Sequence, residues 1–229
     1  MKTKIKKVFT YIITLLILLI SLGLIFNRQI KTSLVAHYNP TVNERIVKQN
    51  KKKKATYDYA KVTALDWQTV LKARAQENRI KIIGEILYPD VNIHLPIGNG
   101  VDNLTLALAA GTLKPNQQMG EKNYALAGHH MVDQNVLFSP LYFKAKVGQK
   151  VYITDEKDIY EYTVSKRQFI KATDVQVVND VPNQKLLTLV TCDDTGAGRL
   201  MIQAKFDKKM NHKQAPQNIQ KQFAAKFNR

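Results

Sequence analysis

Two residues seven positions apart have the types needed for covalent chemistry. Cys192 is the only cysteine in the 229 residues, and it ends the apolar, β-branched run 187–192. A turn rich in Asp and Gly follows, and a second apolar run begins at Arg199. This pattern predicts a β-hairpin with a thiol and a guanidinium at its open end. A lone cysteine is more often a small buried hydrophobe, but at a strand end a substrate can reach it.

The two groups suit the attack of a thiolate on an amide carbonyl. A nearby cation favours the thiolate, which is the nucleophilic form of cysteine. Arg199 stays charged at any working pH, and its forked donors can hold the oxyanion that forms during the attack. The leaving amine needs a general acid, for which histidine is the usual choice. His129 suits that role because it ends the strand-like run Asn-Tyr-Ala-Leu-Ala-Gly-His at 123–129.

Together these motifs resemble those of class A sortases. The shared features are Ala-Gly-His at the end of one strand, Leu-Val-Thr-Cys-Asp-Asp at the end of another, and an arginine that opens the next. The resemblance covers residues 60–206 and implies His129 as general acid and base, Cys192 as nucleophile and Arg199 as the clamp for the oxyanion or the substrate. It also implies a peptide groove, one wall of which is the connection 168–182. The candidate substrate-binding residues are Ala127, His130, Val190 and Thr191.

The resemblance implies a cysteine transpeptidase of the Gram-positive cell surface. Such an enzyme cleaves a Leu-Pro-x-Thr-Gly (LPxTG) sorting signal between Thr and Gly through a thioester. An amine of lipid II or of the peptidoglycan cross-bridge then resolves the thioester. The implied partners are surface proteins that carry the signal, the wall precursor and the membrane. The alternatives are a pilin-polymerising or hydrolytic relative, and a non-enzymatic surface-binding module in which Cys192 is part of the core.

The positive charge of the chain lies mostly in its flanks. The formal net charge is +17, but residues 57–204 hold sixteen Lys/Arg and sixteen Asp/Glu. Residues 1–56 hold twelve basic residues and one acid, and residues 205–229 hold seven and one. No aromatic side chains interrupt the run Lys-Lys-Lys-Lys at 51–54, so the pattern does not favour nucleic-acid binding. This run is either part of a solvated spacer or a contact for anionic lipid head groups or acidic wall polymers.

An uncharged, apolar run of nineteen residues at 8–26 predicts a transmembrane helix. The four lysines before it favour a cytoplasmic N-terminus and an extracellular catalytic domain. The alternative is a cleaved signal peptide, for which Leu-Val-Ala at 34–36 is a weak cleavage site. We therefore expect a basic N-terminus, a membrane anchor, a basic juxtamembrane linker, a catalytic domain and a basic C-terminal tail. Their bounds are 1–7, 8–26, 27–56, 57–206 and 207–229.

The catalytic region reads as a mainly β fold. Strands are predicted at 82–87, 91–97, 123–129, 148–154, 159–164, 187–192 and 199–204, with helices at 62–76, capped by Asp66, and at 102–113. Short antiparallel strands with turn-rich joins indicate a closed β-barrel with peripheral helices, and the resemblance implies eight strands. His94 sits opposite the apolar residues of its strand, so we expect it at the surface.

The sequence does not favour a metal ion or another cofactor. His129 and His130 are neighbours on a strand and point to opposite faces, so they cannot readily share one ion, even with Asp133 nearby. Some class A sortases bind calcium through acidic residues before the histidine strand. The comparable residues 104–118 contain no Asp or Glu here, and calcium needs oxygen ligands that are usually carboxylates. We therefore predict no calcium dependence.

Overall fold

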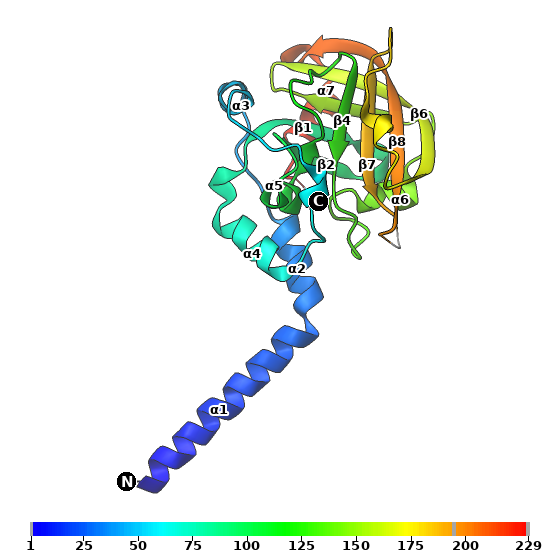
Figure 1. The fold of residues 1–229 in the computed structure, drawn as a ribbon. Coiled ribbons are helices and arrows are strands. Elements are labelled where there is room, and N and C mark those ends of the chain that lie inside the picture. Colours follow the sequence, from blue (N-terminus) through cyan, green and yellow to red (C-terminus); the bar gives the residue numbers. More distant parts are fainter. Residues whose placement is uncertain (1, 194–195, 228–229) are drawn as a thin grey trace.

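The computed structural model describes residues 2–193 and 196–227, and a closed barrel of eight strands lies at its centre (Figure 1). Around the barrel the strands follow the order β1-β2-β3-β4-β7-β8-β6-β5. The pairs β2–β3 and β4–β7 are parallel and the other neighbours are antiparallel. The predicted barrel is confirmed, but the expected antiparallel arrangement does not extend to these two pairs. The strands are Ile82–Tyr88 (β1), Ile93–Gly98 (β2), Ala110–Thr112 (β3), Asn123–Ala127 (β4), Lys150–Thr154 (β5), Asp158–Lys171 (β6), Leu186–Cys192 (β7) and Gly198–Asn211 (β8).

Alternate residues of the strands fill the interior of the barrel. In β4, Tyr124 and Leu126 belong to the main core, whereas Ala125 belongs to a smaller apolar cluster on the other face. In β7, Leu187 and Leu189 are in the main core, and Val190 packs against the smaller cluster. Because successive side chains of a strand point to opposite faces, the last residues of β4 and β7 present one side chain inward and the next outward.

Helices lie around the barrel and at the N-terminal end of the chain. They are Lys2–Ile25 (α1), Asn27–Ala36 (α2), Glu44–Lys51 (α3), Trp67–Ala75 (α4), Asn103–Leu108 (α5), Ser139–Lys144 (α6) and Gln217–Phe223 (α7). Short 3₁₀ turns occur at Tyr59–Lys61, Glu77–Arg79, Pro89–Val91, Val175–Val178 and His212–Gln214. The helix α1 extends away from the barrel (Figure 1), and its residues 6–25 are long and apolar enough to cross a membrane.

The segment 27–56 differs from the solvated spacer that its basic composition predicts. Helices α2 and α3 lie in this segment, and Val35, Tyr38, Val47 and Asn50 are buried. The Asn50 side-chain amide donates a hydrogen bond to the carbonyl of Ile82 in β1 (2.9 Å). The few apolar residues of the segment are thus buried against the folded domain, which ties the segment to the barrel.

The basic C-terminal tail begins inside strand β8 and ends in a helix that packs on the barrel. Strand β8 continues to Asn211 and pairs with β6 along its whole length, from Lys171 opposite Gly198 to Asp158 opposite Asn211. Acidic residues of β6 face lysines of β8, as in the ion pair between Asp158 and Lys209 (2.8 Å). Composition alone hides this strand because its exposed face is charged. Beyond it, Ile219 and Phe223 of α7 pack with Leu87 and Ile159 on the outside of the barrel.

The expected surface position of His94 is wrong. Its side chain is buried, and Nε2 lies 2.8 Å from a carboxylate oxygen of Glu85. The rings of Phe223 and Phe227 lie against it, with ring centroids 5.8 and 4.5 Å away. The alternation in β2 is real, but the C-terminal segment covers the outer face of the strand, so a polar side chain there does not reach water.

Two predicted helices are shorter than expected. Helix α4 begins at Trp67, after Asp66 has accepted a hydrogen bond from the Thr69 backbone N–H (2.7 Å), so the predicted cap is confirmed. The expected helix 102–113 ends at Leu108 as α5, and the next residues form β3 between β2 and β4. Pairing on both sides outweighs the local helical preference of this apolar stretch.

Candidate active site

The parallel pairing of β4 and β7 brings the predicted histidine and cysteine to one end of the barrel. Ala127, the last residue of β4, pairs with Val190, and the Gly128 N–H donates to the carbonyl of Val190 (3.1 Å). His129 follows Ala127 by two residues, and Cys192 follows Val190 by two. The same step along two neighbouring strands keeps both side chains on the outer face and next to each other.

The antiparallel pairing of β7 and β8 adds the arginine. Cys192 and Arg199 are register partners, so their side chains leave the same face of the sheet. Nη1 of Arg199 donates to the carbonyls of Gly196 (3.0 Å) and Gly198 (2.8 Å). Asp193 closes the base of the turn, because its carboxylate accepts a hydrogen bond from the Gly198 N–H (3.0 Å). The predicted hairpin is therefore present, and residues 194 and 195 of its turn lie outside the described residues.

These three side chains line one cavity of about 350 Å³ on the outer face of the sheet. Ala127 and Val190 form part of its wall, as the resemblance implied. The connection between β6 and β7 forms one wall, which was also implied. That wall begins at the end of β6 and includes Ile170, Lys171, Ala172, Asp174, Val175, Val177 and Val178.

Sequence reasoning missed another part of the cavity wall. Residues 59 and 62–64, which precede α4, line it, together with Val101, Leu106 and Leu113. No local motif distinguishes these residues from an ordinary loop and an ordinary core. Their position follows from the apolar cluster beneath the cavity, in which Val62 packs with Leu106 and Ala125. Most of the side chains that line the cavity are apolar, and such a cavity suits a peptide with apolar side chains.

The other two predicted substrate-binding residues do not line this cavity. Thr191 is buried, and its hydroxyl donates to the carbonyl of Gly128 (2.8 Å). His130 turns to the other side of the strand end, where Nδ1 donates to the carbonyl of Cys192 (3.0 Å). The His130 ring lies against Tyr142, with centroids 5.2 Å apart. Both residues therefore connect the backbones that carry His129 and Cys192.

A glycine is required immediately before His129. A Cβ atom on Gly128 would lie 2.6 Å from the ring of Phe138, closer than packed atoms approach each other. The Phe138 N–H donates to the carbonyl of His129 (3.1 Å). Phe138 therefore restricts the residue type at position 128 and also fixes the backbone at the end of β4. Gly128 thus lets the backbone pass close to Phe138 and directs His129 to the cavity.

The environment of His129 favours its neutral form. Burial lowers the pKa of His129 to about 4, and the positive charge of Lys31 acts in the same direction. Lys31 belongs to α2, and its ammonium donates to the carbonyl of Leu65 (3.3 Å) near the cavity wall. A neutral imidazole can accept the proton of a thiol, and the resulting imidazolium can pass that proton to a leaving amine.

A cysteine, a histidine and an arginine that line one cavity of a closed β-barrel are a set of groups that can carry out thiol-dependent acyl transfer. A family model for the sortase domain matches residues 86–207. The chain is 36% identical over 229 residues to sortase A of Streptococcus agalactiae, covering 95% of this chain and 92% of that protein. It is also 36% identical over 186 residues to sortase A of Listeria monocytogenes, covering 79% of this chain and 83% of that protein.

The solved structure of Listeria monocytogenes sortase A has a similar fold. It superposes with a TM-score of 0.59 at 34% identity, over 63% of this chain and 99% of that chain. The chain therefore belongs to the sortase family, and its relatives place it in class A. It is a cysteine transpeptidase of the Gram-positive cell surface, which excludes the alternative of a non-enzymatic binding module.

Proposed function

We propose that the chain cleaves an LPxTG-type sorting signal between Thr and Gly and transfers the surface protein to an amine of a peptidoglycan precursor. The observation that supports this proposal is the single cavity that His129, Cys192 and Arg199 share. The apolar walls formed by Ala127 and Val190 suit the Leu and Pro side chains of such a signal. Its Thr-Gly bond would then lie beside His129, Cys192 and Arg199.

In this proposal His129 and Cys192 exchange one proton in each half of the reaction. His129 removes the proton from the Cys192 thiol as the sulfur attacks the Thr carbonyl carbon. The tetrahedral intermediate collapses when His129 gives that proton to the nitrogen of Gly, so the C–N bond breaks and a thioester remains. An incoming amine then loses a proton to His129 and attacks the thioester carbonyl. The C–S bond breaks, and the Cys192 sulfur takes the proton back from His129.

We assign Arg199 to the oxygen that carries negative charge in both intermediates. Two backbone carbonyls hold its Nη1, so the guanidinium is oriented before substrate arrives. His130 and Thr191, predicted to contact substrate, fit better as positioning residues because their hydrogen bonds join the two strand ends. No metal or other cofactor takes part, and we expect EDTA to leave the rate unchanged.

The acceptor that we propose is the amine of lipid II or of its cross-bridge. Such an amine is carried on the outer surface of the cell membrane. This location suits an enzyme that α1 anchors in the membrane, with the N-terminus in the cytoplasm and the catalytic residues outside. The lysines before the apolar run favour this orientation. Within this proposal residues 8–26 are the anchor, residues 57–206 carry the chemistry, and the segments 27–56 and 207–229 pack on that domain.

The experiment uses the full chain in detergent micelles, because α2 and α3 bury side chains against the domain. The protein is mixed with a peptide that contains Leu-Pro-Glu-Thr-Gly, with and without an oligoglycine or alanine amine, and the products are read by mass spectrometry. We expect a product joined after Thr and an adduct on Cys192, both absent in Cys192→Ala. Cleavage with water alone, even at high amine concentration, would instead identify a hydrolytic relative. An untouched peptide together with a thiol that reacts readily would show that the assigned signal is wrong.

A further inference from the structure

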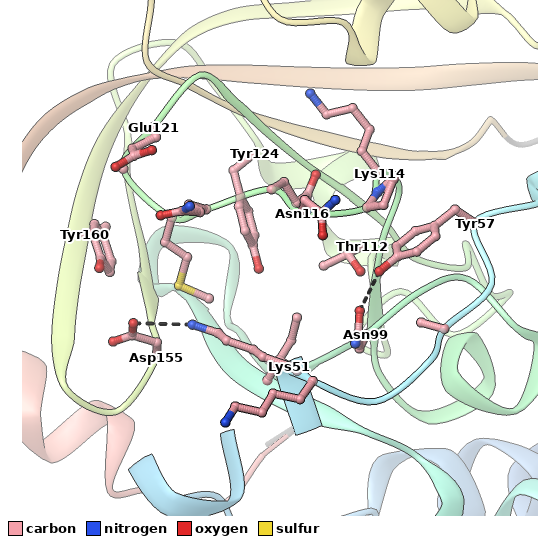
Figure 2. A pocket seen from close by; sticks show the side chains of 18 of the residues that line it. Lys51, Tyr57, Asn99, Thr112, Lys114, Asn116, Glu121, Tyr124, Asp155 and Tyr160 are labelled. Atoms are coloured by element: carbon pink, nitrogen blue, oxygen red, sulfur yellow. Dashed lines mark hydrogen bonds and ion pairs between the residues drawn. The ribbon is translucent and has the colours of Figure 1, made fainter. Parts of the chain in front are cut away.

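A second, larger cavity of about 950 Å³ lies away from the catalytic residues. Figure 2 shows that Lys51 lies on one side of this cavity and Lys114 on another, with Tyr124 between them. We call it the basic pocket. Its walls come from residues 51–55, residues 114–121, and Tyr57, Asn99, Asp155, Tyr160, Lys185, Phe206 and Lys209.

The basic pocket and the active site are at opposite ends of the same strands. Tyr124, near the start of β4, lines the basic pocket, and Ala127 at its end lines the catalytic cavity. Lys185 precedes β7 and lines the basic pocket, whereas Cys192 ends β7 in the catalytic cavity. Seven residues of strand span about 23 Å. The basic pocket is therefore a separate site, and the proposed reaction does not use it.

The lining of this pocket is strongly positive. Seven lysines line it, at positions 51, 52, 53, 54, 114, 185 and 209, against two carboxylates, Glu121 and Asp155. Three of the lysines form ion pairs, namely Lys51 with Asp155, Lys114 with Asp180 and Lys209 with Asp158. The other four lie within 4.0 Å of no carboxylate among the described residues. An excess of exposed cations around a concave surface attracts anions and concentrates them there.

Hydrogen bonds from Asn99 and Lys81 fix the backbone of the lysine run over the pocket. Asn99 is buried, and its side-chain amide donates to the carbonyls of Asn50 and Lys53 (3.3 Å each). The Tyr57 hydroxyl donates to the Asn99 side-chain oxygen (2.8 Å), and the Lys81 ammonium donates to the carbonyl of Lys54. A solvated spacer would not be held in this way. The lysine side chains thus project from a fixed backbone. Less conformational entropy is then lost when a ligand binds.

The shape of the pocket favours an extended ligand with several charges. Its volume far exceeds that of one phosphate, and its charges are spread over segments from α3, the 114–121 loop and the start of β7. Asn116, Gln118 and Tyr160 add hydrogen-bond donors between the lysines. Lysine binds phosphate as a point charge without strict geometry, so a flexible chain can place successive phosphates on different lysines.

The position of the anchor argues against lipid head groups of the same membrane. Helix α2, which follows the apolar α1, contacts the active-site end of the barrel. Arg28 donates to the carbonyl of Val132 (3.2 Å), just beyond the catalytic histidine, and Lys31 donates to that of Leu65. Helix α3, whose end carries the lysine run, lies farther from α1 than α2 and α4 do (Figure 1). The lysine run at the end of α3 therefore lies on the part of the domain that is farther from the anchor.

We propose that the basic pocket binds a linear polymer with repeating phosphodiester groups, such as a polyol-phosphate chain of the wall. Placing that polymer outside the membrane rests on the orientation proposed above, whereas binding of the polyanion does not. The bound polymer would hold the far end of the domain in the wall while the catalytic end faces the membrane.

The test compares two triple variants of the full chain in nanodiscs of zwitterionic lipid. The pocket variant is Lys52→Gln, Lys54→Gln and Lys185→Gln, which removes lysines that pair with no carboxylate in the part of the chain that the structure describes. The control is Lys72→Gln, Lys213→Gln and Lys221→Gln, which removes the same charge from exposed positions outside the pocket. Binding of synthetic poly(glycerol phosphate) is measured by calorimetry at several salt concentrations. Cleavage of the LPETG peptide is measured in parallel, so a failure of the proposed reaction is seen separately.

We expect the Kd of the pocket variant to rise at least tenfold and that of the control less than threefold. Each lost lysine should also make the salt dependence less steep, by roughly one counterion per lysine. An equal loss in the two variants would overturn the proposal, because binding would then depend on net charge alone. Absence of binding to the parent at about 0.15 M salt would also overturn it. So would a pocket variant that binds the polymer normally and loses affinity only for added phosphatidylglycerol vesicles, because the pocket would then serve lipid.

Discussion

The Thr191 hydroxyl donates a hydrogen bond to the carbonyl of Gly128 (2.8 Å), and both residues are buried. Thr191 immediately precedes Cys192, and Gly128 immediately precedes His129. This one bond therefore joins the two backbone positions from which the proposed nucleophile and the proposed proton carrier project. On the far side of the same strand ends, His130 donates to the carbonyl of Cys192 (3.0 Å). The separation of thiol and imidazole is thus fixed by the side chains of Thr191 and His130, neither of which lines the cavity.

Replacing Thr191 by Val should weaken the site without removing any proposed catalytic group. The two side chains have similar shapes, so the variant leaves the Gly128 carbonyl without its partner and costs about 1 to 3 kcal/mol of unfolding free energy. Because the strand ends loosen, kcat should fall more than KM changes. Urea unfolding and steady-state peptide kinetics measure the two effects. Thr191→Ser keeps the hydroxyl and should recover most of the rate; equal rates for Val and Ser would contradict the positioning role.

Arg199 should be needed for the rate and not for the fold. Removing a donor that stabilises an oxyanion typically lowers kcat by about 10² to 10³, so we expect a loss of that size in Arg199→Ala. Arg199→Lys keeps the charge but loses the forked geometry, so its rate should lie between that of the parent and that of Arg199→Ala. Single-turnover formation of the Cys192 adduct is the relevant measurement. A normal rate of adduct formation in Arg199→Ala would remove Arg199 from the proposed chemistry.

Gly128→Ala should destabilise the end of β4. The new methyl group would lie 2.6 Å from the Phe138 ring, and such overpacking costs about 1 to 3 kcal/mol. Because the strained residue precedes His129, the peptide-cleavage rate should fall with stability. Thermal unfolding and kinetics check both. The double variant Gly128→Ala with Phe138→Leu removes the contact and should recover part of the stability; no recovery would mean that the Phe138 contact is not the cause.

Stability should decrease as the pH rises from about 6.5 to 8. Burial raises the pKa of Glu85 to about 8 from 4.5, so the folded protein keeps a proton that the unfolded chain has already released. The free energy of unfolding therefore falls as the pH rises, by up to about 1.4 kcal/mol per pH unit for one proton. The decrease levels off above the pKa of Glu85 in the folded protein. Burial lowers the pKa of His94 to about 4 from 6.5, so His94 makes the stability rise with pH. This contribution acts only below about pH 6.5, the pKa of His94 in the unfolded chain, and does not affect the window from 6.5 to 8.

Glu85→Gln tests this explanation because the amide is neutral at every pH. The slope of unfolding free energy between pH 6.5 and 8 should become shallower in this variant. Burial also raises the pKa of Glu156 to about 7, so part of the slope should remain in the lower half of the window. Glu121→Gln, at an exposed position, is the matched control and should keep the parent slope. An unchanged slope in Glu85→Gln would assign the effect to other groups.

Lys31→Gln should raise the pKa of His129. Lys31 disfavours the imidazolium by charge repulsion, in addition to the larger effect of burial, so its removal shifts the equilibrium toward the protonated ring. Nitrogen NMR of labelled histidines in the full chain gives the titration directly. Lys72→Gln removes a lysine from an exposed position on α4 and should leave the His129 titration unchanged. A lower pKa in Lys31→Gln would contradict the assigned direction.

The sequence by itself determined the local features around the site. The apolar run that ends at Cys192, the turn and Arg199 predict a hairpin, because strand alternation and turn residues act over a few positions. The segment Ala-Gly-His pointed to His129 as the candidate general acid and base. The apolar run 8–26 predicted the helix that is long and apolar enough to cross a membrane. Each of these signals depends only on neighbours along the chain.

Only the tertiary structure decided what lies beside or on top of these elements. The parallel contact of β4 with β7 joins residues more than sixty positions apart, and no periodicity reports such a pairing. Burial of His94 depends on α7, and the basic pocket depends on the lysine run meeting the 114–121 loop. A sequence pattern states which side chains share a face. Which other segment covers that face is fixed by the free energy of packing the whole chain, and this is why the wall at residues 62–64 and the ordered flanks could not be predicted.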